Sequence, residues 1–141
     1  MPRSPLRIAA LATLWIWFAI PAGAFVHQFQ SITIPMRDGK SLAADLYRPA
    51  DTGKWPAVLI QTPYDRRLYR LVFRFEISQD ALLKSPDYAF LIVDWRGFFD
   101  SASAAVPGYD RGNDGYDLVE WIAGQDWSNG NVGTWGASAL G

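Results

Sequence analysis

The chain has 141 residues and a net charge of −1, so it can form one domain at most and offers no electrostatic attraction to nucleic acid or an anionic membrane surface. It contains no cysteine, which excludes a disulfide framework and a thiolate metal site. Seven tryptophans and a hydrophobic share of 50% indicate a substantial core or an aromatic-lined cleft.

The N-terminal segment has the build of a secretory signal peptide. Two arginines precede an uncharged apolar run over residues 8–20, and Ala22-Gly23-Ala24 supplies the small residues of a cleavage site. A membrane anchor is the alternative, but the run is shorter than the ~20 residues that span a bilayer. We therefore predict cleavage after Ala24, which divides the chain into a signal peptide over residues 1–24 and a domain over residues 25–141. The location would be periplasmic or secreted, with no stable membrane anchor.

The first elements of the mature chain read as a β-hairpin followed by a buried strand. Residues 29–35 and 41–48 both alternate in part between apolar and polar side chains, and Asp38-Gly39 lies between them as a turn. Residues 57–61 form a continuous apolar run, as expected of a strand that is buried on both faces of a sheet.

Thr62-Pro63-Tyr64-Asp65 ends this strand, because Pro63 has no N–H to donate to a neighbouring strand. In an α/β sheet this is the carboxyl edge, where ligands bind. Tyr64 could therefore present its phenol to a site at this edge. The alternative is an amphipathic tyrosine at the mouth of a loop.

The middle of the chain contains a second buried strand. Residues 66–84 are compatible with one or two helices, and residues 89–93 form the strand. Asp94 and Arg96 follow at the carboxyl edge, where we predict that they form a structural ion pair. A loop over residues 98–111 comes next. Asp94 precedes the later serine motif in the chain, which makes it a poor candidate for the acid of a catalytic triad.

A run of acidic and amide side chains then suggests a calcium loop, but the pattern fails. Gly112 occupies the third loop position and Trp121 the twelfth, where a calcium loop needs oxygen ligands. Asn113 or Asp114 is instead predicted to cap a helix over residues 115–125.

The end of the chain carries the motif that suggests chemistry. Residues 131–135 read as a short buried strand, and a strand–helix–strand order predicts a parallel sheet. Gly136-Ala137-Ser138-Ala139 then fits the first four positions of the G-x-S-x-G nucleophile elbow, with the second glycine displaced to Gly141. Small neighbours are needed because the serine backbone is forced into an unusual conformation. The alternative is a small-residue strand end without chemistry.

A serine nucleophile requires a base, and the sequence offers one histidine, His27, near the N-terminus. In α/β-hydrolases the triad residues follow the order serine, acid, histidine. The sequence therefore contains a nucleophile motif without the acid and base that such a triad needs.

Several ordered motifs together resemble the X-Pro dipeptidyl-peptidase-like (CocE/NonD) family of serine α/β-hydrolases. The resemblance covers essentially the whole mature chain. Its motifs are Asp38-Gly39, residues 42–49, Thr62-Pro63-Tyr64-Asp65, Asp94-Trp95-Arg96-Gly97, Asp114-Gly115-Tyr116-Asp117, Glu120-Trp121-Ile122-Ala123, residues 125–133 and residues 136–141.

The resemblance implies an α/β fold that corresponds to the N-terminal part of an α/β-hydrolase: a β-hairpin, then parallel strands with crossover helices, truncated just after the elbow. It implies Ser138 as the nucleophile, with Tyr64 and the backbone N–H of Ala139 as oxyanion donors. The substrate would be a small-molecule or peptide ester or amide, and no metal or organic cofactor is implied.

Three departures from the family pattern matter. Ala139 follows the serine where the family usually has an aromatic residue, and Phe98-Phe99-Asp100-Ser101 replaces a loop rich in arginine and glycine. The acid and base of the triad, the helical cap and the C-terminal β-sandwich are absent. The expectation is an exported hydrolase fragment, with a truncated, inactive product or a binding fragment as the alternative.

Overall fold

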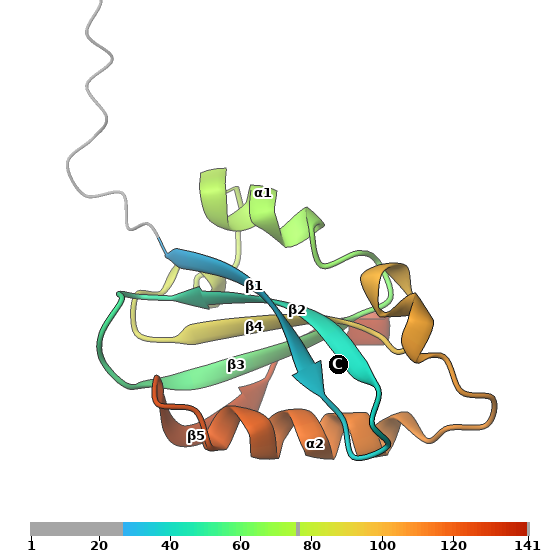
Figure 1. Cartoon of the computed structure of the whole chain (residues 1–141). Coiled ribbons are helices and arrows are strands. Elements are labelled where there is room, and N and C mark those ends of the chain that lie inside the picture. Colours follow the sequence, from blue (N-terminus) through green and yellow to red (C-terminus); the bar gives the residue numbers. More distant parts are fainter. Residues whose placement is uncertain (1–26, 76, 141) are drawn as a thin grey trace, which may run out of the picture.

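The structure is a computed structural model that describes residues 27–75 and 77–140 (Figure 1). The predicted signal peptide, its cleavage site and Gly141 lie outside the described residues. Within the described part of the chain, no helix combines the length and apolar character that a membrane span requires.

The predicted hairpin is confirmed. Strands β1 (Gln28–Pro35) and β2 (Ser41–Arg48) pair antiparallel along their whole length. Gly39 has φ +78° in the turn, a left-handed conformation that glycine adopts without steric cost. The turn is closed by the Met36 N–H, which donates to the Lys40 carbonyl at 2.9 Å.

Five strands form one mixed sheet in the order β1-β2-β4-β3-β5. Strands β3 (Trp55–Thr62) and β5 (Ser128–Thr134) are parallel, as are β3 and β4 (Ala89–Asp94). These pairings confirm the prediction of a parallel sheet. They also bring the carboxyl ends of β3, β4 and β5 to one edge.

Two helices cover opposite faces of the sheet, with α1 (Leu68–Phe75) on one side and α2 (Arg111–Ala123) on the other (Figure 1). Because successive side chains of a strand alternate between faces, each buried strand supplies both cores. The α2 side holds Leu42, Leu59, Leu91, Leu118 and Ile122. The α1 side holds Tyr47, Ile60, Phe73, Phe90 and Ile92.

The start of α2 was predicted wrongly. The helix begins four residues earlier than expected, and its cap is Asp110, whose side chain accepts from the Gly112 N–H at 2.8 Å. Asp114 is not a cap because it is buried inside the helix and paired with an arginine described below. Asp114 therefore forms a long-range ion pair with Arg96 instead of capping the helix.

The segments expected as one or two helices and as a loop contain short helical turns. Residues 66–84 hold α1 and a 3₁₀ turn, η1 (Leu82–Lys84). The loop after β4 holds a second 3₁₀ turn, η2 (Phe99–Ala104). Phe99 enters this turn with φ +42°, an uncommon conformation for an aromatic residue.

The elbow strand was predicted to be buried, and this was wrong. Strand β5 lies at the end of the sheet order and pairs with β3, and most of its residues are exposed. An edge strand has one hydrogen-bonded neighbour, so its outer side faces solvent. The structure also begins this strand at Ser128, three residues before the predicted start.

Candidate active site

The serine motif folds into a tight turn directly after β5. Ser138 has φ +57°, in the left-handed region that costs a non-glycine residue energy, and it opens the 3₁₀ turn η3 (Ser138–Leu140). A Cβ atom on Gly136 would lie 2.1 Å from the carbonyl oxygen of Leu140, so only glycine fits there. The turn therefore has the strained serine and the small neighbour that a nucleophile elbow requires.

The turn is held at the carboxyl edge of the sheet. The Trp135 N–H donates to the Leu59 carbonyl at 3.1 Å, which extends the pairing of β5 with β3 up to the motif. The indole N–H of Trp135 donates to Asp80 at 2.9 Å on the α1 side. Ser138 follows three residues later, and its side chain is exposed.

Tyr64 lies at the same edge, two residues after the end of β3. Its N–H donates to the hydroxyl of Thr62 at 2.9 Å, and its side chain is 54% exposed. The next residue, Asp65, has φ +71°, so the chain turns sharply at this point. Because β3 and β5 are neighbours, the predicted donor and the predicted nucleophile follow adjacent strand ends.

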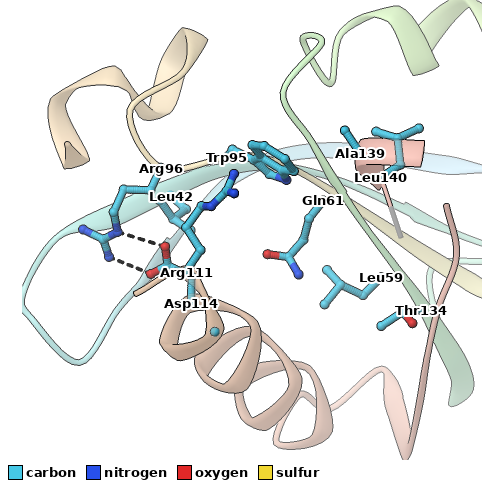
Figure 2. Close-up of a pocket in the computed structure, with 11 residues that line it drawn as sticks. Leu42, Leu59, Gln61, Trp95, Arg96, Arg111, Asp114, Thr134, Ala139 and Leu140 are labelled. Carbon is cyan, nitrogen blue, oxygen red and sulfur yellow. Dashed lines mark hydrogen bonds and ion pairs between the residues drawn. The ribbon is translucent and has the colours of Figure 1, made fainter. Parts of the chain in front are cut away.

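A cleft of about 520 Å³ lies beside the elbow, between the start of α2 and the sheet (Figure 2). Arg111 stacks over the ring of Trp95 at 3.8 Å to the ring centroid. Ala139 borders the cleft, whereas Ser138 and Tyr64 are outside its lining. The lining residues are Leu42, Leu59, Gln61, Trp95, Arg96, Arg111, Gly112, Asp114, Thr134, Ala139 and Leu140.

A buried arginine cluster supports the Tyr64 side of the edge. Arg66 is 5% exposed; its Nε donates to Asp45 at 3.1 Å and its Nη1 donates to Asp94 and, at 2.8 Å, to Asp100. The backbone N–H of Arg66 donates to Asp94 at 2.8 Å. We call Arg66, Arg70, Asp45, Asp94 and Asp100 the Arg66 cluster.

Asp45 is fully buried, as is Asp94. It also accepts from Arg70 at 2.7 Å and from the hydroxyl of Ser31 at 2.6 Å. Burial raises the pKa of Asp45, but the hydrogen bonds from Arg70 and Ser31 and the charges of both arginines outweigh burial, so the pKa lies below its ordinary value.

A second buried arginine organises the α2 side. Arg96 is 7% exposed and forms two hydrogen bonds to Asp114, at 2.9 and 2.7 Å (Figure 2). It also donates to Asp38 at 2.9 Å and to the Ala104 carbonyl at 2.7 Å, and it lies 3.9 Å from the ring centroid of Tyr109. We call Arg96, Asp38, Asp114 and Tyr109 the Arg96 cluster.

These two clusters correct the predicted ion pair between Asp94 and Arg96. Both residues form structural ion pairs, but with other partners. Strand alternation places Asp94 on the α1 side with Ile92, whereas Arg96 follows the strand end and reaches Asp114 of α2. Arg66 was not among the residues predicted from the sequence. The available signal was Asp45, an acid inside an otherwise apolar strand, which needs a buried cationic partner.

His27 is far from the elbow in the topology. It is 8% exposed and packs against the rings of Phe73 and Phe90 at 5.2 and 5.4 Å. Phe90 lies near the amino end of β4, whereas Ser138 follows the carboxyl end of the parallel β5. Burial lowers the pKa of His27 to about 4. The structure thus does not bring His27 and Ser138 together.

No group of three or more histidine, aspartate and glutamate side chains in the described residues is arranged to hold a metal ion. The charged clusters instead satisfy their carboxylates with guanidinium groups. Ser138, Tyr64 and Ala139 all follow strand ends at the carboxyl edge of the sheet, and their catalytic roles stay predictions.

Comparisons with known proteins agree on one family. The model of the S15 family of X-Pro dipeptidyl-peptidases matches residues 38–141. The chain is 41% identical over 113 residues to a cocaine esterase of Rhodococcus sp. (strain MB1 Bresler), a match that covers 79% of this chain and 19% of the esterase. The chain therefore spans about a fifth of this relative's length.

Solved structures show the same likeness. A CocE/NonD family hydrolase from Staphylococcus aureus is 32% identical with a TM-score of 0.64, over 81% of this chain and 24% of that one. An α-amino acid ester hydrolase is 25% identical with a TM-score of 0.63, over 91% and 25% of the two chains. The chain belongs to the S15 family of X-Pro dipeptidyl-peptidases and CocE/NonD hydrolases, and its fold is that of part of an α/β-hydrolase.

Proposed function

We propose that this chain contributes the nucleophile and the oxyanion hole of a serine hydrolase that cleaves esters. The observation that carries the proposal is the strained turn at Ser138, a left-handed serine at the carboxyl end of a strand. Two of the similar proteins are named for ester cleavage, a cocaine esterase and an α-amino acid ester hydrolase, which supports an ester as the substrate class.

The proposed chemistry is acyl transfer in two steps. The Ser138 oxygen attacks the ester carbonyl, its proton passes through a general base to the departing alcohol, and an acyl-serine forms. Water then attacks the acyl-serine, releasing the carboxylic acid and restoring the serine hydroxyl. The negative charge that develops on the carbonyl oxygen would be stabilised by the Tyr64 phenol and the backbone N–H of Ala139.

The described residues hold the proposed nucleophile but no base beside it. Without a base, a serine hydroxyl is a weak nucleophile at neutral pH. His27 packs near the amino end of β4, away from the elbow edge, so it does not supply that base. We therefore expect no measurable hydrolysis of p-nitrophenyl acetate by the 141-residue chain. Turnover that disappears in the Ser138→Ala variant would contradict this expectation.

The proposed nucleophile is tested in a chimera. Residues 38–140 replace the matching segment of the Rhodococcus cocaine esterase, whose remaining chain then completes the fold around them. We expect an active esterase that loses detectable turnover with Ser138→Ala, and a roughly 100-fold lower kcat with Tyr64→Phe. A folded chimera that keeps its activity after Ser138→Ala would refute the assignment.

We also propose that the chain is exported and cleaved after Ala24. The two arginines, the short apolar run and the small residues of the cleavage site support this. The test is the mass of the protein recovered from the periplasm or medium after expression with its own N-terminus. A product with an intact N-terminus that stays in the cytoplasm would refute export.

A further inference from the structure

The loop that carries Tyr64 is held by its neighbours and not by the tyrosine side chain. The Tyr64 phenol is more than half exposed, and the N–H of this residue bonds to Thr62, at the end of β3. On the other side, Asp65 takes a left-handed conformation and leads directly into Arg66. The Asp65 carboxylate accepts from the Arg67 N–H at 3.0 Å, which closes the turn locally, so a separate fixed point is needed to tie the turn to the sheet.

Arg66 supplies that fixed point through both its backbone and its side chain. Its N–H and one guanidinium nitrogen both donate to Asp94, at the end of β4. The same guanidinium reaches Asp45 in β2. Arg66 therefore ties the residues after Tyr64 to two other strands of the sheet.

The guanidinium also reaches the loop after β4. It donates to Asp100 in η2, where Phe99 has its uncommon positive φ. A planar fork with several donors can bridge three carboxylates from three segments, which a lysine ammonium cannot do in the same geometry. The site thus requires arginine and not merely a positive charge.

We propose that Arg66 is a positioning residue that fixes the oxyanion donor Tyr64 at the carboxyl edge of the sheet. The inference rests on the proposed function, because it assigns Arg66 a role in the reaction through Tyr64. Arg66 itself is engaged by Asp45, Asp94 and Asp100, so its proposed effect on the reaction passes through Tyr64. Loss of Arg66 releases the residues after Tyr64 from β2 and β4 and lets the phenol move away from the carboxyl edge of the sheet.

The first test measures the loop in the full 141-residue chain. Arg66→Lys keeps the charge and removes the fork, and Arg96→Lys does the same to an arginine of similar burial. Amide hydrogen exchange by NMR then reports Tyr64 and Arg66 separately from the rest of the chain. We expect exchange at these two amides to rise about tenfold in Arg66→Lys beyond its change in Arg96→Lys.

The second test measures the reaction in the chimera described above. Arg66→Lys should lower kcat about tenfold with little change in KM, because it removes stabilisation that matters in the transition state. In a Tyr64→Phe background the same substitution should cost almost nothing more. Such non-additivity identifies a residue that acts through Tyr64.

Each outcome decides the proposal. Equal exchange at position 64 in the two lysine variants would overturn it, as would additive losses of kcat, since both describe an arginine that only stabilises the fold. A Tyr64→Phe chimera with unchanged kcat would overturn the proposed oxyanion role instead. In that case the exchange measurement still reports whether Arg66 holds the loop.

Discussion

The two buried arginine clusters have similar chemistry and different positions in the chain. In each, one enclosed guanidinium is shared by aspartates from separate segments. The Arg96 cluster joins the hairpin turn at Asp38 to Asp114 in α2. The Arg66 cluster joins β2, the end of β4 and η2, and it does so from the residue that follows the Tyr64–Asp65 turn. The clusters differ in sequence context: Arg66 directly follows the Tyr64–Asp65 turn, whereas Arg96 follows Trp95 after the end of β4.

The comparison shows how a family motif can be mainly structural. Asp38, Arg96 and Asp114 come from three separate motifs of the family pattern, and they form one ion-pair network. The Arg66 cluster serves the same structural purpose, and its place in the chain adds a link to the catalytic edge.

The largest expected effect is the removal of the central acid from each cluster. Asp45→Ala leaves Arg66 and Arg70 without their shared carboxylate, and Asp114→Ala leaves Arg96 without its bidentate partner. A buried charge without its partner costs ~3–5 kcal/mol. Urea denaturation of the 141-residue chain, followed by tryptophan fluorescence, measures both losses.

Equal losses in the free energy of unfolding would show that the two clusters stabilise the fold to the same extent. Amide exchange at Tyr64 distinguishes the two variants, because only Asp45→Ala should raise it. A loss below about 1 kcal/mol in either variant would mean that water or the remaining carboxylates, Asp94 and Asp100 for Arg66 or Asp38 for Arg96, compensate the guanidinium charge.

A smaller effect is expected from acid. The folded pKa of Asp45 is lowered, so its contribution is fully present above the ordinary value near 3.8 and is lost as pH falls through the folded pKa. The midpoint of thermal unfolding should therefore drop as the pH falls below about 4. Asp45→Asn should show a shallower drop, because asparagine does not titrate in this window. Identical slopes for the two proteins would exclude Asp45 as a source of the acid sensitivity.

The smallest expected effect comes from Ser31, which has no counterpart in the Arg96 cluster. Its hydroxyl donates to Asp45 at 2.6 Å. The same hydroxyl accepts from Arg70 at 3.0 Å. Ser31→Ala removes both hydrogen bonds while the pairing of Asp45 with the two arginines remains, so a loss of ~1 kcal/mol is expected. Thr33→Ala, two residues along the same strand, is the matched control. A Ser31 loss no larger than the control would show that these hydrogen bonds add nothing to the stability of the cluster.

Local pattern was enough for the elements whose formation depends on neighbouring residues. The Asp-Gly turn predicted the hairpin, because only a residue tolerant of positive φ fits at Gly39. Continuous apolar runs predicted β3 and β4, because strands covered by helices on both faces exclude polar side chains. The row of small residues around Ser138 predicted the tight turn, which leaves no room for a Cβ at Gly136.

Tertiary structure decided whatever depends on a distant partner. The sequence alone determined the hairpin, the parallel strands and the elbow turn, since each follows from local sterics and hydrophobic pattern. It could not assign Arg66 to Asp94 or Arg96 to Asp38, because charged residues carry no local signal of which distant acid they meet. Those pairings moved the start of α2 away from Asp114, and the strand order left β5 exposed at an edge, because both outcomes depend on segments brought together only when the sheet assembles.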